Sequence, residues 1–258
     1  MKRFLPFAII LIVALVAVGA GVTLYRANRE TVFPPIPGER AAEHPGAKPP
    51  HFKGSTKATV VAEEFADLQC PPCAGLSVLL KKFDDEYAGR VRVVFRHFPL
   101  QMHKHAAEAA RATEAAGLQG RFWEMSEMLF KNQSAWSKAT EVTPIFEQYA
   151  QSIGLDVAKY KADLAQPEKL QSRIDADVAR GDAMKVTATP TLFLNNQRVP
   201  QQSMNDAGIR KAIDALLKGE PAFPSASAAP TATPAAAVPV PTASPAQAAP
   251  PPPPASSP

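Results

Sequence analysis

The chain has 258 residues and a formal net charge of +4, and 46% of its residues are hydrophobic. Lys2, Arg3, Arg26, Arg29 and Glu30 together carry +3 of this charge, so the rest of the chain is nearly neutral and lacks the basic bias of a nucleic-acid-binding domain. Two cysteines are too few for a disulfide-stapled miniprotein or a four-cysteine zinc site.

The N-terminal segment, residues 1–30, contains an uncharged apolar run from Phe4 to Leu24. A helix of this length would be about 31 Å long, which matches the core of a bilayer. The length favours an uncleaved signal anchor; the alternatives are a cleaved signal peptide, whose apolar region usually has about 7–15 residues, and a buried soluble helix. We therefore expect a single-pass protein of the cell inner membrane whose domain lies in the periplasm or an equivalent extracytoplasmic space.

A spacer and a tail flank the segment that is expected to fold. Residues 31–52 are rich in proline, which is typical of a spacer between a membrane and a domain. The tail, residues 220–258, holds 13 prolines and 13 alanines and, after Glu220, no charge, so its burial cannot offset the entropy of ordering. We expect a disordered tail and one folded domain over residues 53–219.

The first part of this domain has the pattern of a βαβ unit. Strands are expected at Lys57–Phe65 and Val91–Phe98, which are rich in β-branched and apolar residues. Between them, Pro72–Tyr87 places its apolar residues on one face of a helix. A strand, a helix and a second strand in this order predict a parallel pair of strands.

The second part of the domain begins with a long helical stretch, residues 103–184. A crossover between strands needs only a dozen or so residues, so this stretch predicts an inserted helical subdomain. Six hydrophobic residues are expected in the core of that subdomain rather than in a peptide groove: Phe122, Trp123, Met125, Met128, Leu129 and Phe130. Strand character returns at Thr191–Leu194, with a short return strand at Arg198–Val199, and Asp206–Leu217 has the pattern of a last helix.

The chemistry is expected at Cys70 and Cys73, in a Cys-Pro-Pro-Cys sequence between the first strand and its helix. This spacing in this position is typical of a thioredoxin-like redox motif. The start of a helix stabilises an anion, which lowers the pKa of the Cys70 thiol and makes its thiolate a nucleophile. Cys73, one turn later, is placed to attack a mixed disulfide on Cys70 and to release the partner.

Two other interpretations of the cysteine pair stay open. One is a static structural disulfide, although so short a loop constrains the unfolded chain little. The other is half of a metal site completed by His97, His103 or His105, although the order and spacing fit no common zinc pattern. We expect no metal and no cofactor besides the redox-active disulfide, and we expect these histidines to be packing or surface residues.

The segment Glu64–Cys73, with the sequence EFADLQCPPC, resembles the active-site segment of the DsbA-like thiol-disulfide oxidoreductases of the thioredoxin superfamily. Phe95–Leu100 and Gln119–Trp123 are similar to stretches of the membrane-anchored branch of that family, and Val186–Phe193 is similar to its second active-site loop. The resemblance runs over residues 53–219. It implies an α/β thioredoxin fold with an inserted α-helical subdomain, which agrees with the order of the predicted elements.

The resemblance also implies site residues beyond the cysteines. Pro190 stands at the family's cis-proline and Thr189 before it would contact the Cys70 sulfur, so both are expected to bind substrate. Glu64 stands where relatives carry a buried acid, which would take the proton from the second cysteine. The strand pattern alone leaves open whether Glu63 or Glu64 points inward.

We therefore expect an enzyme, an extracytoplasmic protein thiol-disulfide oxidoreductase that introduces disulfides into exported client proteins with free thiols. The resemblance implies a membrane redox partner of the DsbB type that regenerates the disulfide. Many strong oxidases of the family carry a histidine between the cysteines, where this chain has Pro71 and Pro72. This departure leaves a reductase or isomerase open as an alternative, beside a thioredoxin-fold binding module or metal carrier that does not turn over.

Overall fold

The computed structural model describes residues 43–223 of the chain. The expected signal anchor, most of the expected spacer and almost all of the expected tail lie outside the described residues. Within residues 43–223, no helix is long and apolar enough to cross a membrane.

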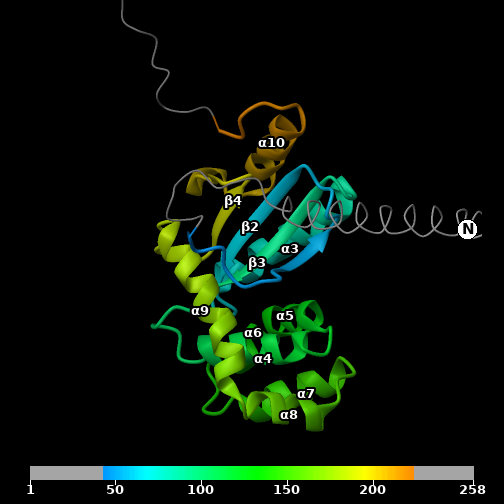
Figure 1. The fold of residues 1–258 in the computed structure, drawn as a ribbon, viewed down its shortest axis with the longest axis vertical. Coiled ribbons are helices and arrows are strands. Elements are labelled where there is room, and N and C mark those ends of the chain that lie inside the picture. The colour runs from blue at the N-terminus through cyan, green and yellow to red at the C-terminus, as the bar shows by residue number, and fades with distance from the viewer. Residues whose placement is uncertain (1–42, 224–258) are drawn as a thin grey trace, which may run out of the picture. The chain divides into compact units, whose positions relative to one another are not determined.

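A five-stranded mixed sheet forms the centre of the fold (Figure 1). Its order is β1-β3-β2-β4-β5, with β2 and β3 parallel and all other neighbours antiparallel. The strands are β1 (His51–Gly54), β2 (Val60–Ala66), β3 (Val91–His97), β4 (Thr191–Leu194) and β5 (Gln197–Arg198). The parallel pair confirms the predicted βαβ unit.

Two helices cover one face of this sheet. They are α3 (Pro71–Tyr87) and α10 (Asp206–Leu217), and both contribute to one apolar cluster with β2, β3 and β4. The buried residues of α3 recur every three or four positions, as the sequence pattern predicted. Its first two residues are prolines, which the first turn tolerates because the N–H groups there have no partner in the helix.

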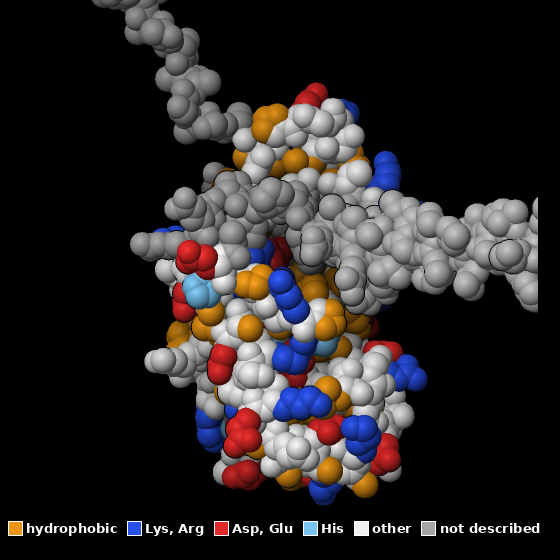
Figure 2. All heavy atoms as spheres, in the orientation of Figure 1, with side chains coloured by type: hydrophobic (Ala, Val, Ile, Leu, Met, Phe, Trp, Pro, Cys, Tyr) orange, Lys and Arg blue, Asp and Glu red, His pale blue; other side chains and the backbone are white. Residues whose placement is uncertain are grey.

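The predicted helical subdomain consists of six helices. They are α4 (Ala106–Gly117), α5 (Phe122–Lys131), α6 (Gln133–Trp136), α7 (Thr143–Ser152), α8 (Val157–Leu164) and α9 (Pro167–Ala183). Phe122, Met125, Leu129 and Phe130 lie in the buried core of this part, as predicted, and Trp123 packs against it partly buried. Met128, also predicted there, is half-buried and lies outside this core cluster. Figure 2 shows acidic and basic side chains interspersed over the face of the subdomain that it presents.

The last of these helices, α9, also packs against the sheet. Figure 1 shows it running from the helical subdomain to the strands. Its C-terminal end packs on the face opposite α3, where a Cβ on Gly181 would lie 2.6 Å from the Phe98 ring and 3.2 Å from Phe65. The insertion is therefore not a separate body, because its final helix supplies one layer of the thioredoxin fold.

The chain before β2 differs from the prediction. Residues up to 52 were expected to belong to the spacer, but His51 pairs with Phe95 in the sheet. Ala47 is buried, and its N–H donates to Asp177 Oδ1 at 2.9 Å. The end of the expected spacer is thus part of the folded domain, held by a partner 130 residues away in the sequence.

Four charged side chains are buried between α9 and the sheet: Glu63 from β2, Arg96 from β3, and Asp177 and Arg180 from α9. The guanidinium groups of Arg96 and Arg180 each donate to Glu63 Oε1 at 2.7 Å, and Arg96 Nη1 donates to Asp177 Oδ1 at 2.9 Å. Burial alone would raise the pKa of Glu63, but the two arginines outweigh it and lower that pKa. The network balances two positive with two negative charges, which is what allows their burial.

Candidate active site

The cysteine pair lies where β2 leads into α3. Cys70 is the N-cap residue of α3, and Pro71 and Pro72 are the first two residues of the helix. Cys70 is 5% exposed and Cys73 is fully buried, and both are free thiols. A reagent from solvent therefore meets the Cys70 sulfur first.

The pKa values of the two thiols are shifted in opposite directions. A hydrogen bond from the Cys73 thiol to the Cys70 sulfur outweighs burial and lowers the pKa of Cys70 to about 6. The same hydrogen bond, together with burial, raises the pKa of Cys73 far above its ordinary value. At neutral pH the pair therefore consists of a thiolate at Cys70 and a thiol at Cys73.

The loop before β4 reaches the Cys70 sulfur. The Thr189–Pro190 peptide bond is cis, and the Cys70 thiol donates to the main-chain oxygen of Thr189 at 3.3 Å. The Thr189 hydroxyl is buried beside the Cys70 sulfur and makes no other hydrogen bond within residues 43–223. Donation from this hydroxyl to the thiolate helps to lower the pKa of Cys70. The structure thus brings Thr189 and Pro190 beside the reactive sulfur.

Glu63 and Glu64 are both buried, on opposite faces of β2. Glu63 faces α9 and its arginines, whereas Glu64 lies on the α3 side, 2% exposed. Burial raises the pKa of Glu64 to about 8, and the charge of Cys70 adds to this shift. Glu64 is therefore a neutral acid at pH 7. Its charge, when present, raises the pKa of Cys73, which shows that the two groups interact.

Asp67 belongs to the site although it was not predicted there. Its Oδ2 accepts from the Leu100 N–H at 2.8 Å and lies 2.7 Å from His103 Nδ1, and its Oδ1 accepts from the Gln69 N–H at 2.7 Å. The charge of Asp67 opposes ionisation of Cys70 and raises its pKa. The only sequence feature that could have indicated Asp67 is the position of an acidic residue directly after a buried strand.

Two glutamines, also missed, tie the cysteine loop to the helical subdomain. Gln133 Nε2 donates to the main-chain oxygens of Leu68 at 2.8 Å and of Cys70 at 3.1 Å. Gln69 Oε1 accepts from the His105 N–H at 2.7 Å. The subdomain therefore fixes the backbone that carries the nucleophile, and no periodic pattern marks residues with this role.

The histidines do not join the cysteines. His97 Nε2 lies 3.3 Å from Glu114 Oε1, and His105 Nδ1 lies 2.6 Å from Glu108 Oε2. His103 contacts Asp67, as described above. Within residues 43–223, no three or more His, Cys, Asp or Glu side chains are arranged to hold a metal ion.

The family model Thioredoxin_4, described as thioredoxin, matches residues 47–215, a range that begins at the buried Ala47. Oxidised BdbD from Bacillus subtilis is 26% identical with a TM-score of 0.57, over 67% of this chain and 98% of BdbD. DsbA2 from Pseudomonas aeruginosa is 29% identical with a TM-score of 0.52, over 64% of this chain and 92% of that protein.

Among curated proteins, the Na⁺/H⁺ antiporter NhaA 1 of Mycolicibacterium gilvum is 36% identical over 152 residues, which are 57% of this chain and 24% of the antiporter. A second relative, the antiporter NhaA of Herminiimonas arsenicoxydans, is 32% identical over 189 residues, 70% of this chain and 29% of that protein. The chain thus spans about a quarter of the length of the curated relatives that it matches.

Proposed function

We propose that this chain, which belongs to the thioredoxin family and is a DsbA-like thiol-disulfide oxidoreductase, works as a dithiol oxidase that introduces disulfides into client proteins. The observation that carries the direction is the pKa of Cys70, lowered to about 6. A free cysteine has a pKa of about 8.5. Stabilising the thiolate stabilises the reduced pair, and a pair with a stable reduced form is a strong oxidant.

The reaction starts from the Cys70–Cys73 disulfide. A client thiolate attacks the Cys70 sulfur, the S–S bond breaks, and Cys73 leaves with the bonding electrons. Glu64, which is neutral at pH 7, donates the proton that Cys73 takes up. The client is then joined to Cys70 by a mixed disulfide.

The second step releases the client. Another client thiolate attacks the client sulfur of the mixed disulfide, a client disulfide forms, and Cys70 leaves as the thiolate that the hydrogen bond from Cys73 stabilises. The client has lost two electrons and the enzyme has gained them. The loop at Thr189 and Pro190, which lies beside the Cys70 sulfur, is the proposed contact for the client backbone.

The proposal includes an extracytoplasmic location and a regenerating partner. Disulfides persist in oxidising compartments, and the apolar segment Phe4–Leu24 favours export and membrane attachment. Each turnover leaves a dithiol, so an oxidant must restore the disulfide. We assign this step to a membrane redox partner of the DsbB type.

The reduction potential of the Cys70–Cys73 pair in the full chain, measured by equilibration with glutathione buffers, tests the direction. A value above about −160 mV would support the oxidase, and one below about −220 mV would assign a reductase, since DsbA lies near about −120 mV and thioredoxin near about −270 mV. Cys70→Ser should abolish exchange, and Cys73→Ala should trap clients on Cys70. Failure to recover any mixed disulfide from Cys73→Ala would contradict the mechanism.

A further inference from the structure

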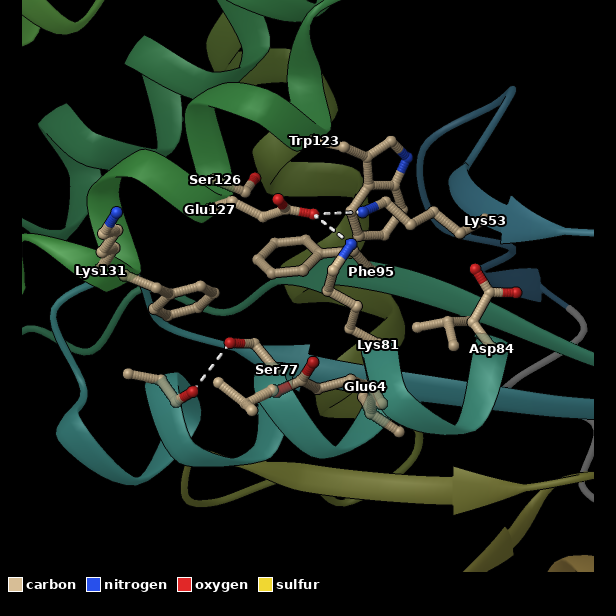
Figure 3. A pocket seen from close by; sticks show the side chains of 15 residues that line it. Lys53, Glu64, Ser77, Lys81, Asp84, Phe95, Trp123, Ser126, Glu127 and Lys131 are labelled. Carbon is tan, nitrogen blue, oxygen red and sulfur yellow. Dashed lines mark hydrogen bonds and ion pairs between the residues drawn. The ribbon is translucent and has the colours of Figure 1, made fainter. Parts of the chain in front are cut away.

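A pocket of about 410 Å³ opens between α3 and α5, on the α3 side of the sheet (Figure 3). Its volume falls within the range of small-molecule sites, about 300–1,000 Å³. The walls are mainly apolar and include two aromatic side chains from the subdomain. The larger apolar lining residues are Val78, Leu80, Val93, Phe95, Trp123 and Phe130.

One polar group in this pocket lacks a partner. Glu64 lines the pocket from β2, and its Oε1 is buried without a hydrogen-bond partner among the described residues. A buried polar atom without a partner costs free energy, and nearly all such atoms in folded proteins are satisfied. Because Glu64 carries its proton at pH 7, it offers a donor to whatever enters.

The mouth of the pocket does not select a charged molecule. Figure 3 shows Lys53 and Lys81 directed at Glu127, and the Lys81 Nζ–Glu127 Oε1 distance is 3.8 Å. Asp84 and Lys131 also line this rim. Charges of both signs lie close together there, so the requirements for an occupant come from the apolar walls and the single donor.

We propose that this pocket binds a small uncharged aromatic molecule whose carbonyl oxygen accepts a hydrogen bond from Glu64, and that its binding slows thiol exchange. The aromatic ring would lie against Phe95 and Trp123. An acceptor binds the neutral acid better than the carboxylate, so every step in which Glu64 loses its proton becomes slower. The binding stands by itself, whereas the slowing rests on the proposed role of Glu64 as proton donor to Cys73.

Acetophenone is a suitable probe, measured by isothermal titration calorimetry on the full reduced chain. We expect one molecule bound per chain. Glu64→Met removes the donor and should weaken binding about fivefold, the effect of one ordinary hydrogen bond. Glu64→Gln keeps a donor in its amide and should bind acetophenone with an affinity close to that of the wild type.

The pH dependence separates these variants further. Affinity for acetophenone should fall above pH 8 in the wild type, because the donor is lost, and should stay constant in Glu64→Gln. Both proteins share every other titratable group near the site, so effects that do not depend on the charge of Glu64 cancel in the comparison. These groups are Cys70 and Cys73 from the redox site, Lys53 from β1, Lys81 and Asp84 from α3, and Glu127 and Lys131 from α5.

Filling the pocket provides the control. Ser126→Phe from α5 or, if that variant does not fold, Ala74→Leu from α3 should abolish binding, and acetophenone should slow insulin reduction in the wild type alone. The proposed site would be overturned if acetophenone still bound to a folded variant with a filled pocket. It would also be overturned if Glu64→Met bound acetophenone as tightly as the wild type does. Binding without any effect on exchange would overturn the regulation. Cys70→Ser should still bind acetophenone, because the pocket does not depend on the redox chemistry. A failure of the proposed function can therefore be told apart from a failure of the proposed binding site.

Discussion

Glu64 should make the stability of the reduced protein depend on pH in an unusual direction. Its pKa is raised from 4.5 to about 8 by burial and by the charge of Cys70. The folded state therefore binds this proton more tightly than the unfolded state does. The contribution to the free energy of unfolding is complete below pH 4.5 and is lost as the pH rises to 8, whereas a carboxylate with a lowered pKa loses its contribution on acidification.

The size of the effect follows from the shift. One pKa unit corresponds to about 1.4 kcal/mol, so the full shift of Glu64 amounts to about 5 kcal/mol and the part lost by pH 7 to about 3 kcal/mol. Since folded domains are stable by only about 5–15 kcal/mol, the ionisation of this one group is a large fraction of the total.

Glu64→Gln isolates this contribution, because glutamine keeps the shape of the side chain and cannot ionise. We expect the variant to gain stability relative to the wild type by about 3–4 kcal/mol between pH 5 and pH 8, with a plateau above. The measurement is urea unfolding of both reduced proteins across this range. All other titrating groups are common to the two proteins and largely cancel in the difference.

The same pair of measurements in a Cys70→Ala background separates the two causes. Burial is the larger cause, so the rise should persist in reduced size when the charge of Cys70 is gone. A stability difference that stays flat between pH 5 and pH 8 in both backgrounds would refute the burial of Glu64. A rise that vanishes in Cys70→Ala would mean that the thiolate charge alone shifts the carboxyl.

Three further predictions concern the redox pair and the packing around it. Alkylation of Cys70 by iodoacetamide should titrate near pH 6, and in Cys73→Ala, which lacks the S–H donor, its midpoint should move toward about 8.5, as followed by mass spectrometry. Arg96→Met leaves two buried carboxylates short of a partner and should cost about 3–5 kcal/mol in urea unfolding. Gly181→Ala places a Cβ 2.6 Å from a phenylalanine ring and should cost about 1–3 kcal/mol. Gly75→Ala, where an added Cβ would have no neighbour within 4 Å beyond the adjacent backbone of its own helix, is the matched control and should stabilise by about 0.5–1 kcal/mol.

The parts of the fold that the sequence predicted are those encoded locally. The apolar faces of α3 and α10 and the β-branched runs of β2 and β3 are periodic within one element, so each could be recognised alone. β1 has only four residues, HFKG, with three half-buried positions and no alternation. It is a strand because β3 pairs with it, and a sequence window does not contain that partner.

The residues of the site likewise fall into those that the local sequence predicts and those that only long-range packing brings there. The spacing of Cys70 and Cys73 and their place before a helix are local features, so the sequence alone indicates redox chemistry there. Gln133 is 63 residues from Cys70 in the sequence and reaches it only because α6 packs beside the cysteine loop. Neither the residue type nor the local sequence distinguishes Gln133 from an ordinary surface residue, so its role arises from long-range packing alone.

The charges of the site suggest how one buried proton is directed during turnover. The thiolate of Cys70 raises the pKa of Glu64, and the carboxylate of Glu64 raises the pKa of Cys73, so a single negative charge at a time is favoured here. When Cys70 enters a mixed disulfide, its charge disappears and part of the shift of Glu64 disappears with it. Glu64 then gives up its proton more readily, at the stage when Cys73 must exchange one. In the proposed mechanism, the covalent state of Cys70 thus sets the acidity of Glu64, the group that exchanges a proton with Cys73.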